Sequence, residues 1–564
     1  MMMWWFVVAC RSEGEPTVPV VDTSSDCPAG SVDVDGSCVS CDARVGTLHE
    51  RHLRVDGEQR AYLLHVPEAY TCDERWPVLF DLHGTAGALP EEAYGLDGAI
   101  ETADAEGFLL VRPRSRSSLE GGSEVYRWDQ NPGDTDRNAV FLEALLERLS
   151  EDYVIDPDRV YVMGFSSGTN QTARAARDAD SPFHGFGHVG GGAWSVQEQR
   201  ASGRTYLHTP WRDYMRAYHH QLVELLDEAG SPAADRYERQ SSSGHDLYDW
   251  IYPELWAFLD RGERPDPGTP SADWERIPGA PEQLLAVTVD EGGTAWFTGV
   301  DGDVLSWDGD AFAVAAIEGA AVFDETSLTG VCFTGGGTGA AVGNGTVLWT
   351  DDAGVSWRHL DPLDEPGPPM FGYTLWTGVA CSPTEVLGMG YWSAGRSSDG
   401  VDWQDAVMGT SYRVQAQAAA QAPTGTWVAG GYYAYLGRSD DGGATFAKVG
   451  TTGGADWVLG VAAVGEQGFV AVGDRGVILR SDDDGRTFQQ VGADGRDLYA
   501  VAFADDLTGL AVGRSGAAWA TDDGGRTWRD ASLGADVMLS SVAFLADGDA
   551  IVAGEGGPWR LAMP

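Results

Sequence analysis

The sequence predicts a multidomain chain in which an α/β domain, with a mostly parallel sheet and helices on both faces, is followed by an all-β, seven-bladed propeller. Three observations lead to this prediction. The 564 residues exceed what a single core usually accommodates. Apolar runs of strand type alternate with helical segments over residues 46–262. Residues 273–564 repeat with a period typical of propeller blades.

The chain is strongly acidic, with 86 Asp and Glu against 37 Lys and Arg and a formal net charge of −49. A surface of this charge repels phosphate backbones, so nucleic acid is not an expected partner. The acidic residues are spread along the chain and form no acidic tail. We therefore interpret the charge as a solubility feature.

Residues 1–10, MMMWWFVVAC, resemble a lipoprotein signal that ends at Cys10, the residue that would carry the lipid. No basic residue precedes the apolar run, and the run is short for a signal sequence. We expect export, either to the cell surface or as a secreted protein, with a membrane contact only through this lipid. The alternative is an uncleaved hydrophobic end. Residues 11–45 are rich in Ser, Asp, Gly and Pro, which indicates a cysteine-containing tether.

Six further cysteines, an even number, fit a set of disulfides in an exported chain. The pair at Cys38 and Cys41 has CxxC spacing, but the neighbouring cysteines lack the pattern of a zinc knuckle. We predict disulfides and no metal site, and the sequence leaves open which cysteines pair. The six are Cys27, Cys38, Cys41, Cys72, Cys332 and Cys381.

The α/β domain is expected over residues 46–262 because strands and helices alternate there. A linker rich in Pro and Gly follows at residues 263–272. The expected strands are Ala61–Val66, Pro77–Leu82, Phe108–Arg112, Arg159–Gly164 and Arg204–His208, and the main helices are Ala139–Leu149 and Tyr214–Ala229.

A glycine-flanked serine carries the chemistry predicted for this domain. The strand at 159–164 runs into residues 164–168, GFSSG, and residues 169–177 are compatible with a helix. In a G-x-S-x-G motif between a strand and a helix, the glycines are expected to allow a tight turn that exposes the serine hydroxyl. The helix N-terminus favours developing negative charge there. Ser166 is therefore the candidate nucleophile.

A serine of this type needs an acid and then a histidine later in the chain. Asp213 follows the strand at Arg204–His208, and His245 comes before the closing helix. Both are expected at carboxyl ends of strands, where the sites of open α/β sheets gather. We predict that His245 takes the Ser166 proton and that Asp213 orients His245.

Other residues compete for these roles or support them. Asp246 and Asp235 remain alternative acids. His219 and His220 lie within a predicted helix and are interpreted as surface residues. The loop that follows the strand Pro77–Leu82 predicts an oxyanion hole, with the backbone N–H groups of Thr85 and Ser167 as donors. Trp128 is expected either to line an acyl or alcohol pocket or to be a core aromatic.

Several runs of this domain resemble the secreted polyhydroxybutyrate depolymerase and feruloyl esterase group of α/β-hydrolases. They are RAYLLHVPEAY, WPVLFDLHG, GFLLVRP, DTDRNAVFLEALLERL, DYVIDPDRVYVMGFSSG and a late GH pair. The resemblance covers residues 47–260. It implies hydrolysis of a carboxylic ester, which can be polymeric, through an acyl-enzyme on Ser166 without a metal or cofactor. The chain departs from the group at Thr169 and in the condensed segment Trp211-Arg212-Asp213.

The second half of the chain is repetitive. Short strands that end in glycine recur at intervals of 40 to 45 residues, by subtraction, which predicts one four-stranded blade per repeat. These glycines are Gly299, Gly343, Gly388, Gly430, Gly473, Gly513 and Gly554. The last repeat stops at residues 559–561, before an outer strand. We predict that residues 273–277 supply that strand and close the ring.

Five repeats carry an acidic turn that ends in an aromatic residue. The turns are TDDAGVSW, SSDGVDW, SDDGGATF, SDDDGRTF and TDDGGRTW. They resemble the Asp boxes of propellers related to sialidases, sortilin-type receptors and photosystem assembly factors. Because their spacing differs from that of calcium loops, we predict that their aspartates stabilise the turns and bind no metal.

Two classes of function follow. The first is an exported serine esterase or depolymerase whose propeller binds the substrate, a protein or a glycan. The second is a surface binding protein with an inactive hydrolase domain, in which Tyr391-Trp392 and Tyr432-Tyr433 would contact the partner. A serine peptidase is a further alternative, because prolyl oligopeptidases also join a propeller to a hydrolase.

Overall fold

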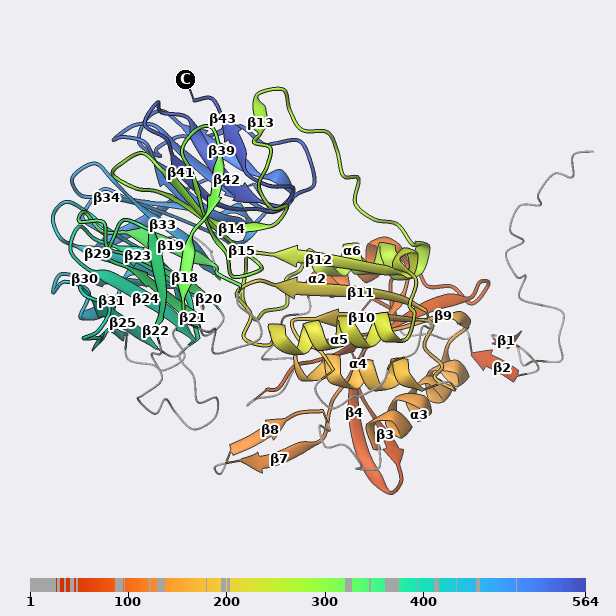
Figure 1. Cartoon of the computed structure of the whole chain (residues 1–564). Coiled ribbons are helices and arrows are strands. Elements are labelled where there is room, and N and C mark those ends of the chain that lie inside the picture. The colour runs from red at the N-terminus through yellow and green to blue at the C-terminus, as the bar shows by residue number, and fades with distance from the viewer. Residues whose placement is uncertain are drawn as a thin grey trace, which may run out of the picture.

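The fold was obtained as a computed structural model and consists of an α/β domain and a β-propeller (Figure 1). The structure describes residues 27, 31–34, 37–40, 45–46, 49–86, 95, 97–120, 123–128, 137–178, 180–193, 199, 203–319, 327–343, 346–360, 375–391, 393–409, 415–432, 434–452, 457–492 and 494–563. Among the helices within these ranges, none is long and apolar enough to cross a membrane.

The α/β domain is built on one eight-stranded sheet in the order β12-β11-β10-β9-β5-β6-β4-β3. The strands from β12 to β6 are parallel, and β4 and β3 complete the edge in antiparallel pairing. Their bounds are β3 His49–Val55, β4 Glu58–His65, β5 Trp76–Leu82, β6 Leu109–Pro113, β9 Ile155–Phe165, β10 Gly185–Val189, β11 Arg204–Pro210 and β12 Arg236–Ser241. Two small hairpins accompany the sheet: β1 Ser31–Val34 with β2 Ser37–Ser40, and β7 Ser117–Glu120 with β8 Ser123–Tyr126.

Helices cover both faces of this sheet (Figure 1). Every position of β5 is buried, as expected of a strand covered on both sides. On one face lie α3 Arg137–Asp152, α4 Ser167–Arg177 and α5 Arg216–Glu228. On the other lie α2 Asp97–Glu106, α6 Ile251–Trp256 and the π-helical turn η2 Ala257–Arg261. A short 3₁₀ turn, η1 Ala233–Asp235, precedes β12.

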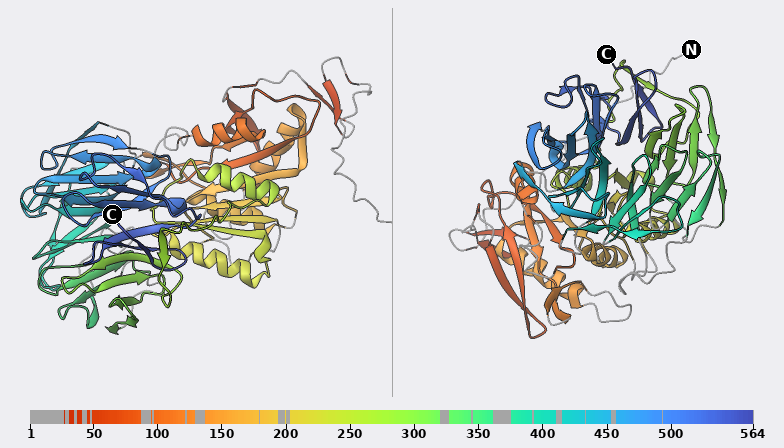
Figure 2. Two further views of the ribbon diagram at one scale, coloured as in Figure 1. Left: turned by 90° about the horizontal axis from the view of Figure 1, so that it is seen from above. Right: turned by 90° about the vertical axis from the view of Figure 1, so that its left-hand side faces the viewer.

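The propeller has seven blades arranged as a ring (Figure 2). In the first three blades the strands are β14 Leu284–Val289, β15 Ala295–Gly299, β16 Val304–Trp307 and β17 Phe312–Val314; β19 Gly330–Phe333, β20 Gly339–Gly343, β21 Thr346–Thr350 and β22 Ser356–Leu360, with β18 Ala316–Glu318 outside; and β23 Leu375–Cys381, β24 Val386–Tyr391, β25 Ala394–Ser397 and β26 Gln404–Asp405.

The fourth to sixth blades follow the same plan. Their strands are β28 Ala416–Gln421, β29 Trp427–Gly431, β30 Tyr435–Ser439 and β31 Thr445–Lys448, with β27 Val407–Met408 outside; β33 Val458–Val464, β34 Gly468–Gly473, β35 Ile478–Ser481 and β36 Thr487–Gly492, with β32 Gly450–Thr452 outside; and β37 Leu498–Phe503, β38 Gly509–Gly513, β39 Ala518–Thr521 and β40 Arg529–Asp530.

The seventh blade closes the ring with a strand from the other end of the propeller sequence. It contains β41 Leu539–Phe544, β42 Ala550–Gly554, β43 Trp559–Leu561 and β13 Trp274–Arg276. Strand β13 pairs antiparallel with β43, placing Trp274 opposite Leu561. The prediction that residues 273–277 supply the missing outer strand is therefore confirmed, and this blade has no unpaired third strand.

The acidic turns use their aspartates internally. In the fourth blade, the backbone N–H and the hydroxyl of Thr445 donate to the Asp441 carboxylate at 2.9 and 2.6 Å, and Ser439 donates to it at 2.7 Å. These hydrogen bonds, led by that from the Thr445 hydroxyl, lower the pKa of Asp441 to about 2. Three further turns repeat the contacts around Asp352, Asp483 and Asp523. The turns are thus stabilised by their own carboxylates.

The α/β domain contacts one face of the ring (Figure 2). The Arg239 guanidinium donates to both carboxylate oxygens of Asp536 at 3.1 and 2.8 Å, and the Trp250 indole N–H donates to Asp497 at 2.8 Å. Both aspartates precede the first strand of a blade, whereas the acidic turns join third and fourth strands. The domain therefore covers the face of the propeller opposite to the acidic turns.

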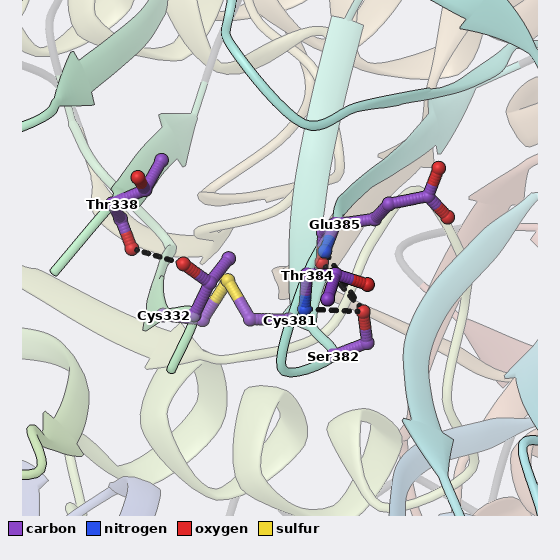
Figure 3. Close-up of a disulfide and its surroundings, with 7 residues drawn as sticks. Cys332, Thr338, Cys381, Ser382, Thr384 and Glu385 are labelled. Carbon is purple, nitrogen blue, oxygen red and sulfur yellow. Dashed lines mark hydrogen bonds between the residues drawn. A yellow bond between two sulfur atoms is a disulfide. The ribbon is translucent and has the colours of Figure 1, made fainter. Parts of the chain in front are cut away.

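Disulfides join segments in both halves of the chain. Cys27 is bonded to Cys38, Cys332 is bonded to Cys381, and Cys72 is also disulfide-bonded. The bond between Cys332 and Cys381 connects β19 to β23, the first strands of neighbouring blades (Figure 3). The pairing that the sequence left open is therefore a link between the second and third blades.

We predict that replacing Cys332 and Cys381 together by alanine destabilises the propeller. Because the bond closes a loop with a sequence separation of 49 residues, the loop-closure relation gives a loss of about 4 kcal/mol. Denaturant unfolding under oxidising conditions measures this loss. Wild-type protein in reductant is the control and should approach the variant. Equal midpoints for oxidised wild type and variant would contradict the prediction.

Candidate active site

Ser166 lies in the turn that joins β9 to α4. Its backbone has a φ of 52°, a conformation that residues other than glycine rarely adopt. The glycines on either side keep negative φ and serve another purpose. A Cβ on Gly164 would lie 2.2 Å from the backbone of Gly168, and a Cβ on Gly168 would lie 2.1 Å from the carbonyl oxygen of Leu82. The serine therefore takes the strained turn, and the glycines allow the close packing around it.

Ser166, His245 and Asp213 form one hydrogen-bonded chain. His245 Nε2 is 2.8 Å from Ser166 Oγ, and His245 Nδ1 is 2.9 and 3.0 Å from the two carboxylate oxygens of Asp213. The three residues follow β9, β12 and β11, so they meet at the carboxyl edge of the parallel sheet. The structure thus brings together the three residues that the sequence singled out.

The electrostatics of this chain fit a histidine that accepts a proton from serine. Asp213 is only 1% exposed, and Ser166 is 8% exposed. One oxygen of Asp213 also accepts the backbone N–H of Met215 at 2.8 Å, which fixes the carboxylate. A carboxylate at Nδ1 favours the tautomer that carries the proton on Nδ1, which leaves Nε2 as an acceptor facing the hydroxyl.

The alternative acids are placed differently. Asp235 belongs to η1 and comes before β12, whereas His245 follows the other end of that strand. Asp235 is therefore at the opposite edge of the sheet. Asp246 follows His245 directly, and its backbone N–H donates to the carbonyl of Gly244 at 2.9 Å. Asp213 is the carboxylate that the structure places on the His245 ring.

The predicted oxyanion loop is held by a buried histidine. His83 Nδ1 is 2.6 Å from the carbonyl oxygen of Gly84, and His83 Nε2 accepts the backbone N–H of Ser115 at 3.0 Å. Burial lowers the pKa of His83 to about 3, so the ring is neutral. The carbonyl oxygens of Leu82 and His83 lie against Gly168 at the start of α4. The loop that carries Thr85 is thus adjacent to Ser167, the first residue of that helix.

Trp128 supports the same loop from the core. It is completely buried, and its indole N–H donates to the carbonyl of His83 at 2.8 Å. A direct contact of Trp128 with substrate stays a prediction. The sequence predicted no role for the His83 side chain in holding this loop. Its position two residues before the expected donor Thr85 was the signal that could have indicated one. Cys10, the predicted lipid attachment site, lies outside the described residues.

The interpretation of His219 as a surface residue is wrong. His219 is buried on α5, where its Nε2 contacts the Thr209 hydroxyl and lies 3.5 Å from a carboxylate oxygen of Glu238. The predicted helix is confirmed as α5, but its inward face also carries the polar His219, because Thr209 of β11 and Glu238 of β12 present matching polar groups. His219 therefore belongs to the support of the strands that lead to the site.

The propeller tyrosines proposed as contacts for an external partner are also placed differently. Tyr391 and Tyr432 are each 2% exposed. The Tyr391 ring lies 4.9 Å from that of Tyr214 in the α/β domain, and the Tyr214 ring lies 4.7 Å from that of His245. The two propeller tyrosines thus face the loops that carry Asp213 and His245 and present no free surface. Trp392 and Tyr433 lie outside the described residues.

Comparison with known proteins relates this chain to esterases. It is 33% identical over 150 residues to the putative esterase NocK of Nocardia uniformis subsp. tsuyamanensis, covering 26% of this chain and 42% of that protein. Poly(3-hydroxyalkanoate) depolymerase C of Paucimonas lemoignei is 26% identical over 146 residues, covering 25% and 34% of the two chains. Probable feruloyl esterase C of Aspergillus terreus is 26% identical over 144 residues, covering 24% and 48%. The chain spans less than half the length of each relative.

These relatives are named as esterases and a depolymerase, which supports a carboxylic ester hydrolase and agrees with the resemblance found in the sequence. No family model matches the chain. Among solved structures, YCF48 from Cyanidioschyzon merolae is similar with 19% identity and a TM-score of 0.42, covering 51% of this chain and 98% of that one. A streptogramin B lyase is similar with 11% identity and a TM-score of 0.43, covering 52% and 97%.

We predict that Asp213→Asn lowers kcat for a p-nitrophenyl ester by roughly 10³- to 10⁴-fold, because the amide favours the wrong histidine tautomer. Steady-state hydrolysis of p-nitrophenyl butyrate measures the loss. The matched controls are Asp246→Asn and Asp235→Asn, the other two carboxylates considered for this role. A larger loss in either control than in Asp213→Asn would reassign the acid.

Proposed function

We propose that this protein is a serine carboxylic ester hydrolase of the α/β-hydrolase type, acting through an acyl-enzyme on Ser166. The observation that carries the proposal is the hydrogen-bonded chain from Ser166 Oγ through His245 to Asp213, at the carboxyl edge of a parallel sheet. The similarity to proteins named as esterases and a depolymerase supports the same chemistry. The geometry thus supports a serine hydrolase, and the similarity to the named relatives favours esters as its substrates.

The proposed mechanism assigns each residue one step. Ser166 Oγ attacks the ester carbonyl carbon while its proton moves to His245 Nε2, and Asp213 stabilises the resulting imidazolium. The backbone N–H groups of Thr85 and Ser167 donate to the oxyanion. When the tetrahedral intermediate collapses, His245 returns the proton to the leaving alcohol. A water molecule then attacks the acyl-enzyme with His245 as base, releasing the acid and restoring Ser166.

We also propose where the protein acts and which face of the propeller binds a partner. The disulfides support an exported protein, since such bonds persist in oxidising compartments. Attachment to a membrane through a lipid on Cys10 is part of the same proposal. The proposal includes small and polymeric esters, and the depolymerase among the relatives is named for a polymer, poly(3-hydroxyalkanoate). The face of the propeller that carries the acidic turns points away from the α/β domain and is the face proposed to bind a polymer, a protein or a glycan.

We predict that a fluorophosphonate probe labels the native protein and that peptide mapping places the label on Ser166, because only an activated serine reacts quickly. Ser166→Ala should lose the label and all hydrolysis of p-nitrophenyl acetate and butyrate above background. Heat-unfolded wild type is the control, since it keeps the serine but loses the arrangement. A label on another residue would overturn the assignment of the nucleophile.

The same assay separates the alternatives. A folded wild type that neither reacts with the probe nor hydrolyses esters would favour the inactive binding protein. Faster cleavage of a p-nitroanilide than of the matching p-nitrophenyl ester would favour the peptidase.

A further inference from the structure

One hydroxyl of the propeller joins the two loops that carry the acid and the histidine. The backbone N–H of His245 donates to Tyr391 Oη at 3.0 Å, and Tyr391 Oη donates to the carbonyl oxygen of Arg212 at 3.0 Å. Arg212 is the residue immediately before Asp213. A single buried side chain at the end of β24 thus bonds to the backbone of both catalytic loops.

The loop that carries Asp213 makes a second contact with the propeller, through Trp211, the residue immediately before Arg212. Trp211 packs among Leu285, Leu459, Tyr499 and Met538, which belong to the first strands of their blades or directly precede them. Its indole N–H donates to Gln240 Oε1 at 3.2 Å within the α/β domain. Trp211 therefore enters the centre of the ring two positions before the catalytic aspartate.

The histidine loop is fitted closely to the same face of the propeller. A Cβ on Gly244 would lie 1.4 Å from Tyr432 Oη and 2.7 Å from Tyr391 Oη, so this position accepts only glycine. Tyr432 is itself held by Gln417, whose Nε2 donates to its hydroxyl at 2.8 Å. The residue before His245 thus has no room to shift toward the propeller.

We infer that the propeller is a structural part of the active site and that Tyr391 is a positioning residue, which holds His245 and Asp213 at hydrogen-bonding distance. This inference rests on the proposed function. Catalysis by such a chain of residues is sensitive to displacements of about 1 Å, which can reduce rates by roughly 100-fold. The condensed segment at residues 211–213, by which the chain departs from the esterase group it resembles, is the segment that Tyr391 and the apolar propeller residues contact.

Tyr391→Phe tests the inference by removing one oxygen atom and leaving the ring. We expect kcat for p-nitrophenyl butyrate and the rate of fluorophosphonate labelling to fall by roughly 10- to 100-fold, with KM changed little. The matched control is Tyr435→Phe. Tyr435 is also a buried propeller tyrosine, and within the described part of the chain its hydroxyl has no hydrogen-bond partner. This control should retain wild-type kcat.

Hydrogen exchange provides a readout that does not depend on activity. In Tyr391→Phe, peptides covering residues 211–214 and 243–246 should exchange faster, whereas Tyr435→Phe should match wild type. If Tyr391→Phe does not fold, Trp211→Phe tests the same contact between the loop and the propeller, and it should also lower kcat. Wild-type kcat and exchange in a folded Tyr391→Phe would overturn the inference. An inert wild type would instead overturn the proposed function, and the exchange data would still decide whether Tyr391 holds the loops.

A second observation concerns the Arg212 side chain. It is 8% exposed, and across the described ranges it makes no side-chain hydrogen bond or ion pair. The ionisable groups near it are the hydroxyls of Tyr432 and Tyr391, and burial lowers the pKa of its guanidinium. By contrast, the buried Arg112 is paired with Asp81 and the buried Arg239 with Asp536. A buried cation without an anion is costly, which makes this guanidinium exceptional in so acidic a chain.

We infer that Arg212 binds a carboxylate of the ligand beside the catalytic chain, so that the preferred substrates are esters that carry a free carboxylate. A guanidinium forms paired, charge-assisted hydrogen bonds to a carboxylate, and these are strongest where water is excluded. This inference also rests on the proposed function. It concerns the side chain of Arg212, whereas the contact with Tyr391 concerns its backbone.

Two esters of equal acyl length, one ending in a carboxylate and the other in a methyl group, test this second inference. We expect kcat/KM for mono-p-nitrophenyl succinate to exceed that for p-nitrophenyl butyrate by roughly tenfold or more in wild type, and the ratio to fall toward one in Arg212→Met. Arg264→Met, at an exposed arginine of the linker, should keep the wild-type ratio. Independently of catalysis, succinate should raise the Tm of wild type above that in sodium chloride of equal ionic strength, and Arg212→Met should lose this rise. A wild-type ratio near one without stabilisation by succinate would overturn the inference.

Discussion

Trp211, two residues before Asp213, is buried at the boundary between the domains, where it packs in one apolar cluster with residues of four propeller blades. The Arg216 guanidinium lies 3.4 Å from the centre of that ring. Burial of an aromatic side chain holds two surfaces together but leaves their orientation loosely fixed, whereas hydrogen-bonded residues such as Ser166, His245 and Asp213 need a closely defined orientation. The two hydrogen bonds of the Tyr391 hydroxyl, to His245 and Arg212, supply this orientation. Anchoring and alignment are thus divided between two aromatic residues, one from each domain.

Positive and negative side chains are paired at the interface between the α/β domain and the propeller, whereas the chain as a whole is strongly acidic. The chain carries a large excess of carboxylates, and several of its arginines lie at the boundary between the domains. Arg239 contacts Asp536 and Glu254, and Arg514 lies 3.6 Å from Asp497. Buried ion pairs of this kind contribute little net stability, because both partners lose water, but breaking one partner leaves an uncompensated charge. They therefore specify how the domains meet more than how strongly they bind.

Local patterns in the sequence predicted the features that depend on neighbouring residues. The strand, turn and helix around Ser166, the blade repeats and the closing strand at 273–277 all have short signatures. Strand β12 reads RYERQS and offers no apolar run, because its place in the sheet comes from pairing with β11 and from contacts with the propeller. Contacts across long sequence separations had no signature: Tyr391 meets His245 across 146 positions. Asp213 was preferred over Asp246 and Asp235 because it follows the expected strand at Arg204–His208, and the structure shows its carboxylate on the His245 ring.

Strand β13 has a consequence for the order in which the parts of the chain assemble. It lies directly after the linker, yet its partner β43 belongs to the last blade, so the ring closes only after every blade between them has formed. Such long-range pairing is slow compared with local contacts. During synthesis the α/β domain emerges first, and the propeller face that it contacts is complete only at ring closure. If the loops that carry Asp213 and His245 need that face, a newly made chain passes through a stage in which the α/β domain is folded but these loops are not yet fixed, and the proposed activity would develop only as the ring closes.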